Sequence, residues 1–199
     1  MTKRILFLAL TVFAFQSVYA AEEAFQVDTA KSQLDWVAKK VTGEHHGSID
    51  LKTGNLSFDN EKLTGGEFVI DMTSIENHDL EDETWNSKLV NHLKSDDFFS
   101  VENYPVSILK IKEVKNYMDK NSDENYWIIA DLTIKGITNE IEFPAKVDKS
   151  AESVTALASV NVDRTKYDVK FRSGRFFSGL GDKLIYDDFN LNINLAATK

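Results

Sequence analysis

The strongest constraint on the fold of this chain is an alternation of apolar and polar side chains that recurs in short segments. Near the carboxyl end, Leu191, Ile193 and Leu195 are separated from one another by asparagines. Because successive side chains of a β-strand point to opposite faces, such a segment has one apolar and one polar face. Strands of this kind must pack their apolar faces together, which predicts a largely β protein.

The alternation predicts strands at 34–38, 49–51, 56–58, 68–72, 106–114, 126–134, 141–147, 155–162 and 189–197. Turn-forming residues lie between the early strands, at Thr53-Gly54-Asn55 and Thr64-Gly65-Gly66. Most connections are too short for helical crossovers between parallel strands. We therefore expect an all-β fold of about eight antiparallel strands, either a closed barrel or a sandwich.

One face of these strands is predicted to point inward. The inward candidates share apolar side chains at alternate positions and are Trp36, Phe68, Ile70, Met72, Ile128, Ala130, Leu132, Ile134, Phe143, Ala158, Val160, Leu191, Ile193 and Leu195. Their neighbours, such as Asp35, Asp131 and Asn192, are polar and face solvent in this arrangement. The pattern does not distinguish a filled core from a barrel with a cavity, because both have the same period.

Residues 82–94 have helical periodicity instead. Trp85, Leu89 and Leu93 recur at every fourth position and form one apolar stripe. Acidic residues at 81–83 precede the stripe and basic residues lie toward its end, a distribution that complements the helix dipole. The sequence therefore predicts one amphipathic helix in this strand-rich chain.

The predicted helix needs a surface on which to place its apolar stripe. In a barrel protein, the open end of the barrel is the surface most in need of cover. Phe98 and Phe99 follow the helix closely and extend its apolar surface. We expect the helix and this short aromatic segment to cap one end of the barrel.

The first twenty residues have the pattern of a secretory signal peptide. Lys3 and Arg4 form a basic start, residues 5–15 an apolar run, and Val18-Tyr19-Ala20 a cleavage site. Cleavage after Ala20 would leave residues 21–199 as one domain, exported to the periplasm. The apolar run is too short for a membrane span, which takes about 20 residues.

Composition narrows the classes of partner. The chain has no cysteine, which excludes disulfides and a lipid anchor on cysteine. The predicted leader holds two of the 23 basic residues and none of the 32 acidic ones, so the mature chain carries a formal charge of −11. Phosphate backbones and anionic lipid surfaces are repelled by such a chain on average, so we expect no nucleic-acid partner. Local basic groups could still receive an acidic head group.

Several motifs resemble those of the YceI-like family of bacterial secreted lipid-binding proteins. The run Asn-His-Leu-Lys-Ser-Asp-Asp-Phe-Phe at 91–99, followed by Tyr104-Pro105, is similar to the family signature. Further similar motifs lie at 27–36, 132–138, 143–144, 162–167 and 180–185. Two positions depart from the family pattern: an Arg-Asp pair is replaced in the stretch 83–86, and Lys31 stands where many members carry histidine.

The resemblance implies a lipocalin-like, eight-stranded antiparallel barrel whose apolar pocket holds one long-chain amphiphile such as a polyisoprenoid. On this hypothesis the protein transports, stores or shields its ligand, has no catalytic residue and uses no cofactor besides the bound lipid. A homodimer is compatible with the sequence. The residues expected at the lipid tail are Trp36, Phe68, Ile70, Met72, Trp85, Leu89, Phe98, Phe99, Ile128, Leu132, Phe143, Val160 and Leu191. The cationic candidates for a head group are Lys88, His92, Arg164, Arg172 and Arg175.

Two other classes of function stay open from the sequence. A periplasmic β protein with a filled core could act through its acidic surface, as an adaptor or stress protein. A metal protein or enzyme is a third reading, because Glu44, His45, His46, His78 and Asp79 are residue types that bind zinc. Their spacing fits no recognised site, and the usual nucleophile, zinc-helix and phosphate-loop motifs are missing, so we expect neither an enzyme nor a metal site.

Overall fold

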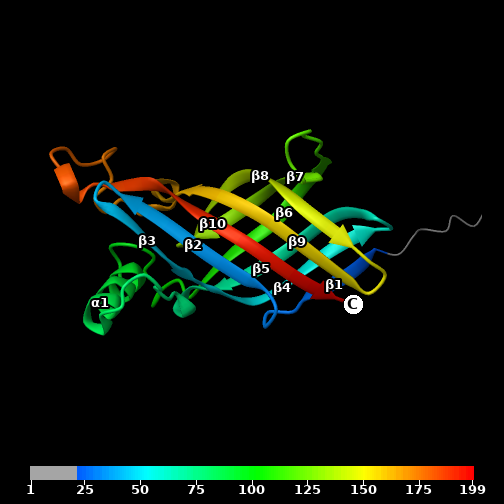
Figure 1. The fold of residues 1–199 in the computed structure, drawn as a ribbon, viewed down its shortest axis with the longest axis horizontal. Helices are drawn as coiled ribbons and strands as arrows, with labels where there is room; N and C mark the ends of the chain where they lie inside the picture. Colours follow the sequence, from blue (N-terminus) through cyan, green and yellow to red (C-terminus); the bar gives the residue numbers. More distant parts are fainter. Residues whose placement is uncertain (1–21) are drawn as a thin grey trace, which may run out of the picture.

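Antiparallel strand pairing in the computed structural model, which describes residues 22–199, closes one sheet into a barrel (Figure 1). The strands are β1 (Glu23–Val27), β2 (Gln33–Lys40), β3 (Gly43–Ser48), β4 (Asp50–Asp59), β5 (Lys62–Asp71), β6 (Val106–Asn116), β7 (Tyr126–Ile134), β8 (Ile137–Lys149), β9 (Ser153–Asp163) and β10 (Ile185–Thr198). The ring runs β1-β4-β5-β6-β7-β8-β9-β10 and closes where Val27 of β1 pairs with Ala197 of β10. This confirms the predicted eight-stranded barrel. The predicted leader, residues 1–20, lies outside the described residues.

The two additional strands extend the barrel at one end. β2 pairs with the first part of β10, and β1 pairs with the last residues of β10. β1 and β2 therefore lie end to end beside the same strand. The chain turns between them at 28–32, where the backbone N–H of Lys31 donates to the carbonyl of Asp28 at 3.1 Å. β3 pairs with β2 and is separated from β4 only by Ile49. The alternation of apolar and polar residues did not predict β1 and β3 as separate strands.

The predicted turn at Thr53-Gly54-Asn55 is wrong, because these residues lie within β4, which runs without a break from Asp50 to Asp59. The segments 49–51 and 56–58, predicted as two strands, are therefore parts of one extended segment. The strand shifts register between Leu51 and Thr53 instead of turning. Gly54 is required for close approach, since a Cβ there would lie 2.7 Å from the ring of Phe68 on β5. The predicted turn at 64–66 is also wrong, because these residues lie within β5. The chain reverses direction before β5 instead, at Asn60, whose φ is 54°.

The hairpin between β7 and β8 has the shortest kind of connection. Lys135 and Gly136 have φ of 51° and 72°, and positive φ at both central residues is the type I′ geometry that matches the twist of paired strands. Thr133 and Thr138, which flank this turn, are joined by a 2.7 Å hydrogen bond between their hydroxyl groups. The pairing fixes which side chains of β7 and β8 face the barrel interior.

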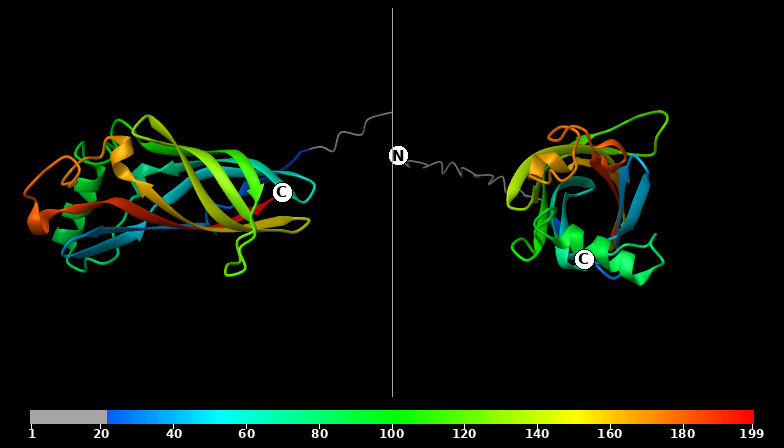
Figure 2. Two further views of the ribbon diagram at one scale, coloured as in Figure 1. Left: turned by 90° about the horizontal axis from the view of Figure 1, so that it is seen from above. Right: turned by 90° about the vertical axis from the view of Figure 1, so that its left-hand side faces the viewer.

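The predicted helix is confirmed as α1 (Glu83–Lys94). Asp82 caps it, since its carboxylate accepts hydrogen bonds from the backbone N–H groups of Thr84 and Trp85, both at 3.0 Å. Figure 2 shows α1 at one end of the barrel, together with the loop before β10, while the carboxyl terminus lies toward the other end. No helix within residues 22–199 is both long and apolar enough to cross a membrane.

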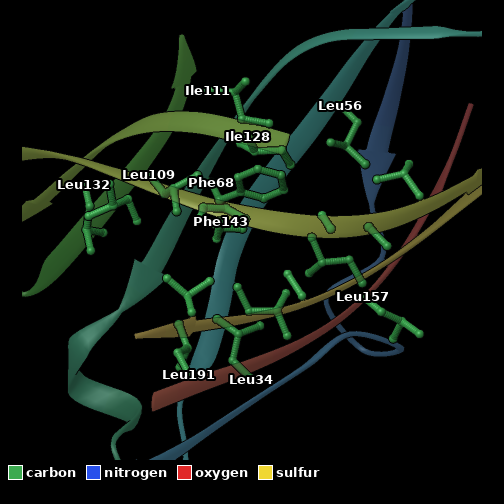
Figure 3. Close-up of a pocket in the computed structure, with 18 of the residues that line it drawn as sticks. Leu34, Leu56, Phe68, Leu109, Ile111, Ile128, Leu132, Phe143, Leu157 and Leu191 are labelled. Atoms are coloured by element: carbon green, nitrogen blue, oxygen red, sulfur yellow. The ribbon is translucent and has the colours of Figure 1, made fainter. Parts of the chain in front are cut away.

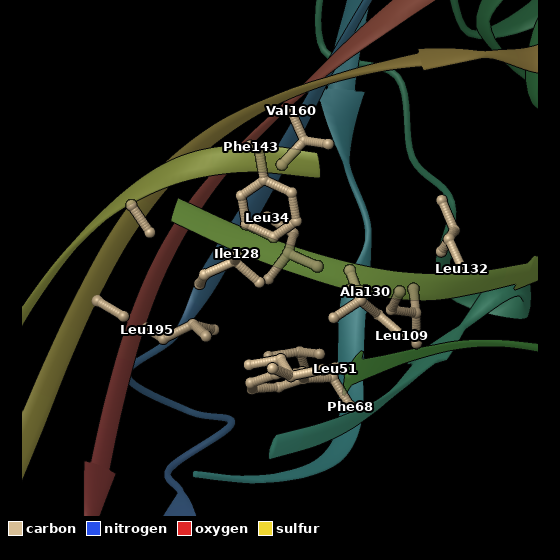
Figure 4. Close-up of a cluster of buried hydrophobic side chains, with 14 of the residues drawn as sticks. Leu34, Leu51, Phe68, Leu109, Ile128, Ala130, Leu132, Phe143, Val160 and Leu195 are labelled. Atoms are coloured by element: carbon tan, nitrogen blue, oxygen red, sulfur yellow. The ribbon is translucent and has the colours of Figure 1, made fainter. Parts of the chain in front are cut away.

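The hydrophobic core lies in the barrel interior (Figure 4). The predicted inward residues are buried there, except that Ala158, Leu191 and Ile193 are only partly buried. These three line an internal cavity, which leaves part of their surface uncovered. The interior therefore contains both close packing and unfilled space.

Three short 3₁₀ helices complete the connections: η1 (Met72–Ser74), η2 (Arg164–Tyr167) and η3 (Gly181–Lys183). η1 leads from β5 toward α1, and η2 and η3 both lie between β9 and β10. The two connections that contain them, 72–105 and 164–184, lie at the same end of the barrel (Figure 2).

Candidate functional site

The barrel interior contains an inner cavity of about 70 Å³. All of its lining residues are apolar, and they come from strands around the ring (Figure 3). Figure 3 shows Phe68 of β5, Ile128 of β7 and Phe143 of β8 close together on one side of the cavity. Leu34 of β2 lies on another side. A cavity without polar groups offers water no hydrogen bonds, so it suits hydrocarbon.

An outer cavity of about 110 Å³ lies at the α1 end of the barrel. Its walls include Leu93 from the last turn of α1 and Phe98 and Phe99 from the segment that follows. The polar side chains of Ser107, Arg164 and the strand residues Tyr186 and Asp188 join its otherwise apolar lining. Almost all of the surface that faces the outer cavity is nevertheless apolar, because Arg164 and Asp188 contribute hardly any polar surface to it.

The two cavities adjoin along the barrel. Ile70, Leu132, Val162 and Leu191 line both of them. A chain-like apolar ligand that occupied both would therefore pass this shared set of side chains. The arrangement gives the barrel an elongated apolar interior, with the polar residues of its lining near the outer end.

The structure brings together most of the residues predicted to meet a lipid tail. The inner cavity is lined by Phe68, Ile128, Phe143 and Val160; both cavities by Ile70, Leu132 and Leu191; and the outer cavity by Trp36, Met72, Phe98 and Phe99. The other two predicted tail residues, Trp85 and Leu89 of α1, line neither cavity.

The prediction for Trp85 is wrong, since its side chain is 60% exposed. α1 contacts the barrel through its final turn, where Leu93 packs against the core. Its first turns are held by polar contacts instead: the Asn86 side chain donates to the carbonyls of Asn77 at 2.8 Å and Leu80 at 3.1 Å. The apolar stripe is therefore anchored at only one end, and Trp85 projects past the surface that it was expected to cover.

Arg164 is a buried cation, only 4% exposed. Its Nε donates to the carbonyl of Tyr186 at 3.0 Å and its Nη1 to that of Val169 at 2.8 Å. Its Nη2 donates to the carbonyl of Ile185 at 3.0 Å and lies 3.7 Å from the carboxylate of Asp187. Burial lowers the pKa of Arg164 from its ordinary value, and the nearby carboxylates oppose that effect.

The other head-group candidates are placed differently. Arg175 is occupied by carboxylates, with Nη1 3.0 Å from Asp163 and Nε 3.6 Å from Asp187. Arg172 is exposed and lies over the ring of Phe171. Lys88 is also exposed and lies over the ring of Trp85, away from both cavities. Of the five candidates, only Arg164 lines either of the two barrel cavities, whereas Arg175 borders an open hollow on the outer surface with Tyr186 and Asp188.

His92 belongs to an aromatic cluster beside the outer cavity. Its ring meets Phe98 edge to face at 5.0 Å and Phe171 at 4.6 Å between centroids. Its Nε2 lies 3.2 Å from the carboxylate of Asp97. His92 therefore connects α1 to the loop before β10 through Phe171, behind the cavity wall formed by Phe98.

A family model described as a YceI-like domain matches residues 25–197. The chain belongs to the YceI-like family. The resemblance carried by the motifs at 91–99 and 162–167 is thereby confirmed. No curated protein sequence matches the chain.

Solved structures share the fold of this YceI-like chain. BcnA of Burkholderia cenocepacia is 21% identical with a TM-score of 0.65, over 86% of this chain and 99% of that one. A polyisoprenoid binding domain from Saccharophagus degradans, implicated in plant cell wall breakdown, is 14% identical with a TM-score of 0.59, over 87% and 97%. The Campylobacter jejuni YCEI protein is 19% identical with a TM-score of 0.53, over 100% and 99%. At these identities, the similarity establishes the fold.

Some cavity residues of this YceI-like protein were missed by the sequence analysis. Leu109 and Ile111 of β6 line the inner cavity, but β6 also has Ile108 on the opposite face, so its alternation does not show which face is inward. Leu56 of β4 was missed because the register shift after Leu51 interrupts the period. β4 and β6 both pair with β5, whose alternation of apolar and polar residues is regular over 68–72. Aligning them with β5 would have predicted that Leu56, Leu109 and Ile111 face inward.

The histidines considered as metal ligands have a structural role in the YceI-like barrel. Nδ1 of His45 lies 2.7 Å from the carboxylate of Asp79, which also accepts from the backbone N–H of His46 at 2.9 Å. Burial acts to raise the pKa of Asp79, but these hydrogen bonds outweigh it and hold the pKa below its usual value. The contacts fasten the segment before α1 to β3. Within residues 22–199, no three side chains of metal-binding type come close enough to hold an ion.

Proposed function

We propose that this YceI-like protein binds one long-chain amphiphile, such as a polyisoprenoid, inside the barrel and carries, stores or shields it in the periplasm. The observation that carries the proposal is the pair of adjoining apolar cavities along the barrel. A structural neighbour described as a polyisoprenoid binding domain has the same fold. The signal-peptide pattern of residues 1–20 supports the location.

Hydrocarbon burial can drive this binding without directed polar contacts. Each buried CH₂ contributes about 0.8 kcal/mol, so a few isoprene units provide a substantial affinity. The cavities of about 70 and 110 Å³ are small for a long tail. A polyisoprenoid would therefore displace some lining side chains, and we expect flexible ones such as Met72 and Leu191 to move first.

Arg164 and Asp188 are the two charged residues beside the outer cavity, and we expect Arg164 to orient the ligand. Among the described residues, Arg164 is the one cation that lines this cavity. Three of its N–H groups are engaged by backbone carbonyls, which fixes the guanidinium in position. We expect an anionic or strongly polar head group at Arg164 and the tail in the inner cavity.

The first experiment is to purify residues 21–199 from a bacterial periplasm, extract the protein with organic solvent and identify co-purified lipid by mass spectrometry. One prenyl or other long-chain species in stoichiometric amount is the expected result. An empty protein that also takes up no added polyisoprenoid would contradict the proposal and favour a filled-core protein that acts through its acidic surface.

A pair of neighbouring substitutions tests the site itself. Ala158 lines the inner cavity, whereas Ser159, the next residue of β9, faces solvent. Ala158→Phe fills the cavity and should reduce bound lipid at least about tenfold, because it competes for the space of several CH₂ groups. Ser159→Phe is the matched control and should retain the lipid. Equal lipid content in both variants would place the ligand outside the barrel interior.

A further inference from the structure

A loop at the α1 end of the barrel presents aromatic side chains to solvent. This aromatic–basic loop, residues 170–183, lies between η2 and β10 and protrudes past the barrel (Figures 1 and 2). Its adjacent residues Phe176 and Phe177 are 46% and 51% exposed. Exposed apolar side chains that gather in one place mark an interaction surface, whereas scattered ones do not.

The exposure of Phe176 and Phe177 is built into the loop. The backbone N–H groups of both donate to the carbonyl of Ser173, at 3.2 and 3.0 Å. Ser173 is itself fully buried, and its hydroxyl accepts from the backbone N–H of Arg175 at 3.2 Å. The loop is also fastened to β10, where the N–H of Ile185 donates to the carbonyl of Arg172 at 3.0 Å. An ordered backbone therefore holds the two rings outward.

The same loop is basic in an acidic protein. It contains Lys170, Arg172, Arg175 and Lys183 against the single acidic residue Asp182, while the predicted mature chain has a formal charge of −11. Lys170 lies 5.2 Å from the ring centroid of Phe176.

Not all of these cations are available to a partner. Arg175 pairs with Asp163 and Asp187, and Lys170 pairs with Asp168. Arg172 and Lys183 are exposed and form no ion pair with any described residue. The loop thus offers two exposed rings and two unpaired cations on one protruding segment.

The loop adjoins the outer cavity. Phe171, near its beginning, packs against His92 of α1 and lies 5.5 Å from the ring of Phe98, which lines the cavity. Ile185 and Tyr186, just beyond its end, line the cavity as well. Whatever binds the loop is therefore held next to the charged end of the barrel interior.

We propose that the aromatic–basic loop docks the protein onto an anionic phospholipid bilayer. The two phenylalanine rings enter the interfacial region, and Arg172 and Lys183 meet the lipid phosphates. The acidic remainder of the protein is repelled by the same surface, so the protein docks by this end alone. A protruding tip with adjacent rings suits a deformable bilayer better than a rigid protein groove. Docking concerns the outer surface and takes place whether the barrel is empty or loaded.

The test is co-sedimentation of residues 21–199 with vesicles of phosphatidylcholine, alone or mixed with phosphatidylglycerol. We expect binding to the mixed vesicles, weakening as salt is added because exposed charges are screened. Phe176→Ser with Phe177→Ser should abolish most of the binding. Arg172→Gln with Lys183→Gln should weaken it roughly fivefold for each charge removed.

Matched controls come from elsewhere on the surface. Met118 is 95% exposed in the β6–β7 loop, so Met118→Ser removes an exposed apolar side chain outside the aromatic–basic loop. Lys110→Gln with Lys120→Gln removes two exposed cations in the same way. Both controls should bind vesicles as the unchanged protein does, and circular dichroism should show that every variant is folded.

Failure to bind mixed vesicles, or equal binding by the loop variants and the controls, would overturn the proposal and leave a protein partner as the occupant of this surface. The lipid content of each variant, measured after extraction, keeps this result separate from the proposed function. Loss of vesicle binding with the barrel ligand retained supports docking by the loop. An empty barrel with vesicle binding retained would contradict only the proposed carrier function.

Discussion

The guanidinium of Arg164 lies 6.0 Å from the ring centroid of Phe98, so a residue of η2 and a residue of the segment after α1 meet at the outer cavity. These two residues come from the two long connections of the barrel, 72–105 and 164–184. Arg164 is fixed by backbone carbonyls and Phe98 by its aromatic neighbours. Their contact therefore joins two independently supported walls of the site, next to the place where we propose that a head group binds.

Replacing Arg164 should destabilise the protein far more than replacing an exposed arginine. Arg164→Met keeps much of the apolar stem but leaves three backbone carbonyls without their donors. We expect a loss of about 3 kcal/mol in the free energy of unfolding, measured by urea denaturation.

Arg175 provides the control, because its side chain is 56% exposed although it also contacts Asp163 and Asp187. Arg175→Gln should cost less than about 1 kcal/mol, as is usual for exposed ion pairs. Similar losses in the two variants would show that the carbonyl contacts of Arg164 contribute little to stability.

Tyr167 should make the protein sensitive to alkaline pH. Its side chain is 1% exposed, and its hydroxyl has no hydrogen-bond partner among residues 22–199. Burial, with a smaller effect of Asp163, raises the pKa of Tyr167 from 10.0 to about 12. Between these two pH values the unfolded chain loses the proton while the folded protein keeps it. The free energy of unfolding therefore falls as the pH rises through this range.

Tyr167→Phe removes that pH dependence. The variant should match or slightly exceed the stability of the unchanged protein at neutral pH, because it also removes an unpaired buried hydroxyl. At pH 11 its advantage in the free energy of unfolding should grow by about 1 kcal/mol. Tyr186→Phe, at a residue 51% exposed, is the control. An advantage that does not change with pH would show that Tyr167 titrates alike in both states.

The contact of α1 with the barrel can be tested at the two ends of its stripe. Leu93 packs against the core and lines the outer cavity, whereas Trp85 is 60% exposed. Leu93→Ala should lower the free energy of unfolding by about 1–2 kcal/mol, somewhat less than for a fully buried leucine. Trp85→Ala should change it by no more than about 0.5 kcal/mol, as is usual for a surface substitution. A larger loss at Trp85 would mean that the first turns of the helix are packed in solution.

The course of the β-strands was predictable where one face is consistently apolar. In β7, β9 and β10, every second side chain is apolar and faces the interior, so the period alone gives the inward face. In β4 the register shift after Leu51 breaks the period, and Gly54 carries the sequence signal of a turn although it makes room for Phe68. A glycine required for close approach has the same sequence signal as one required for a turn.

The candidate site was predictable in its apolar part and much less so in its charged part. Inward-facing residues of paired strands must surround the same interior, which is why Phe68, Ile128 and Phe143 were found together. Arg164 was one of five cationic candidates. In the structure Asp163 pairs with Arg175, while Arg164 is buried against carbonyls distant in sequence.

The sequence by itself determined the alternating strands, the helix that Asp82 caps and the basic, aromatic composition of residues 170–183, because each depends on residues close together in the chain. Only the tertiary structure decided that the barrel interior keeps two cavities, that Trp85 is exposed and that the aromatic–basic loop adjoins the outer cavity. These properties depend on how the side chains of separate strands share one volume and on which connections meet at the same end. Pairing and packing between distant segments set both, and no local pattern of residues records them.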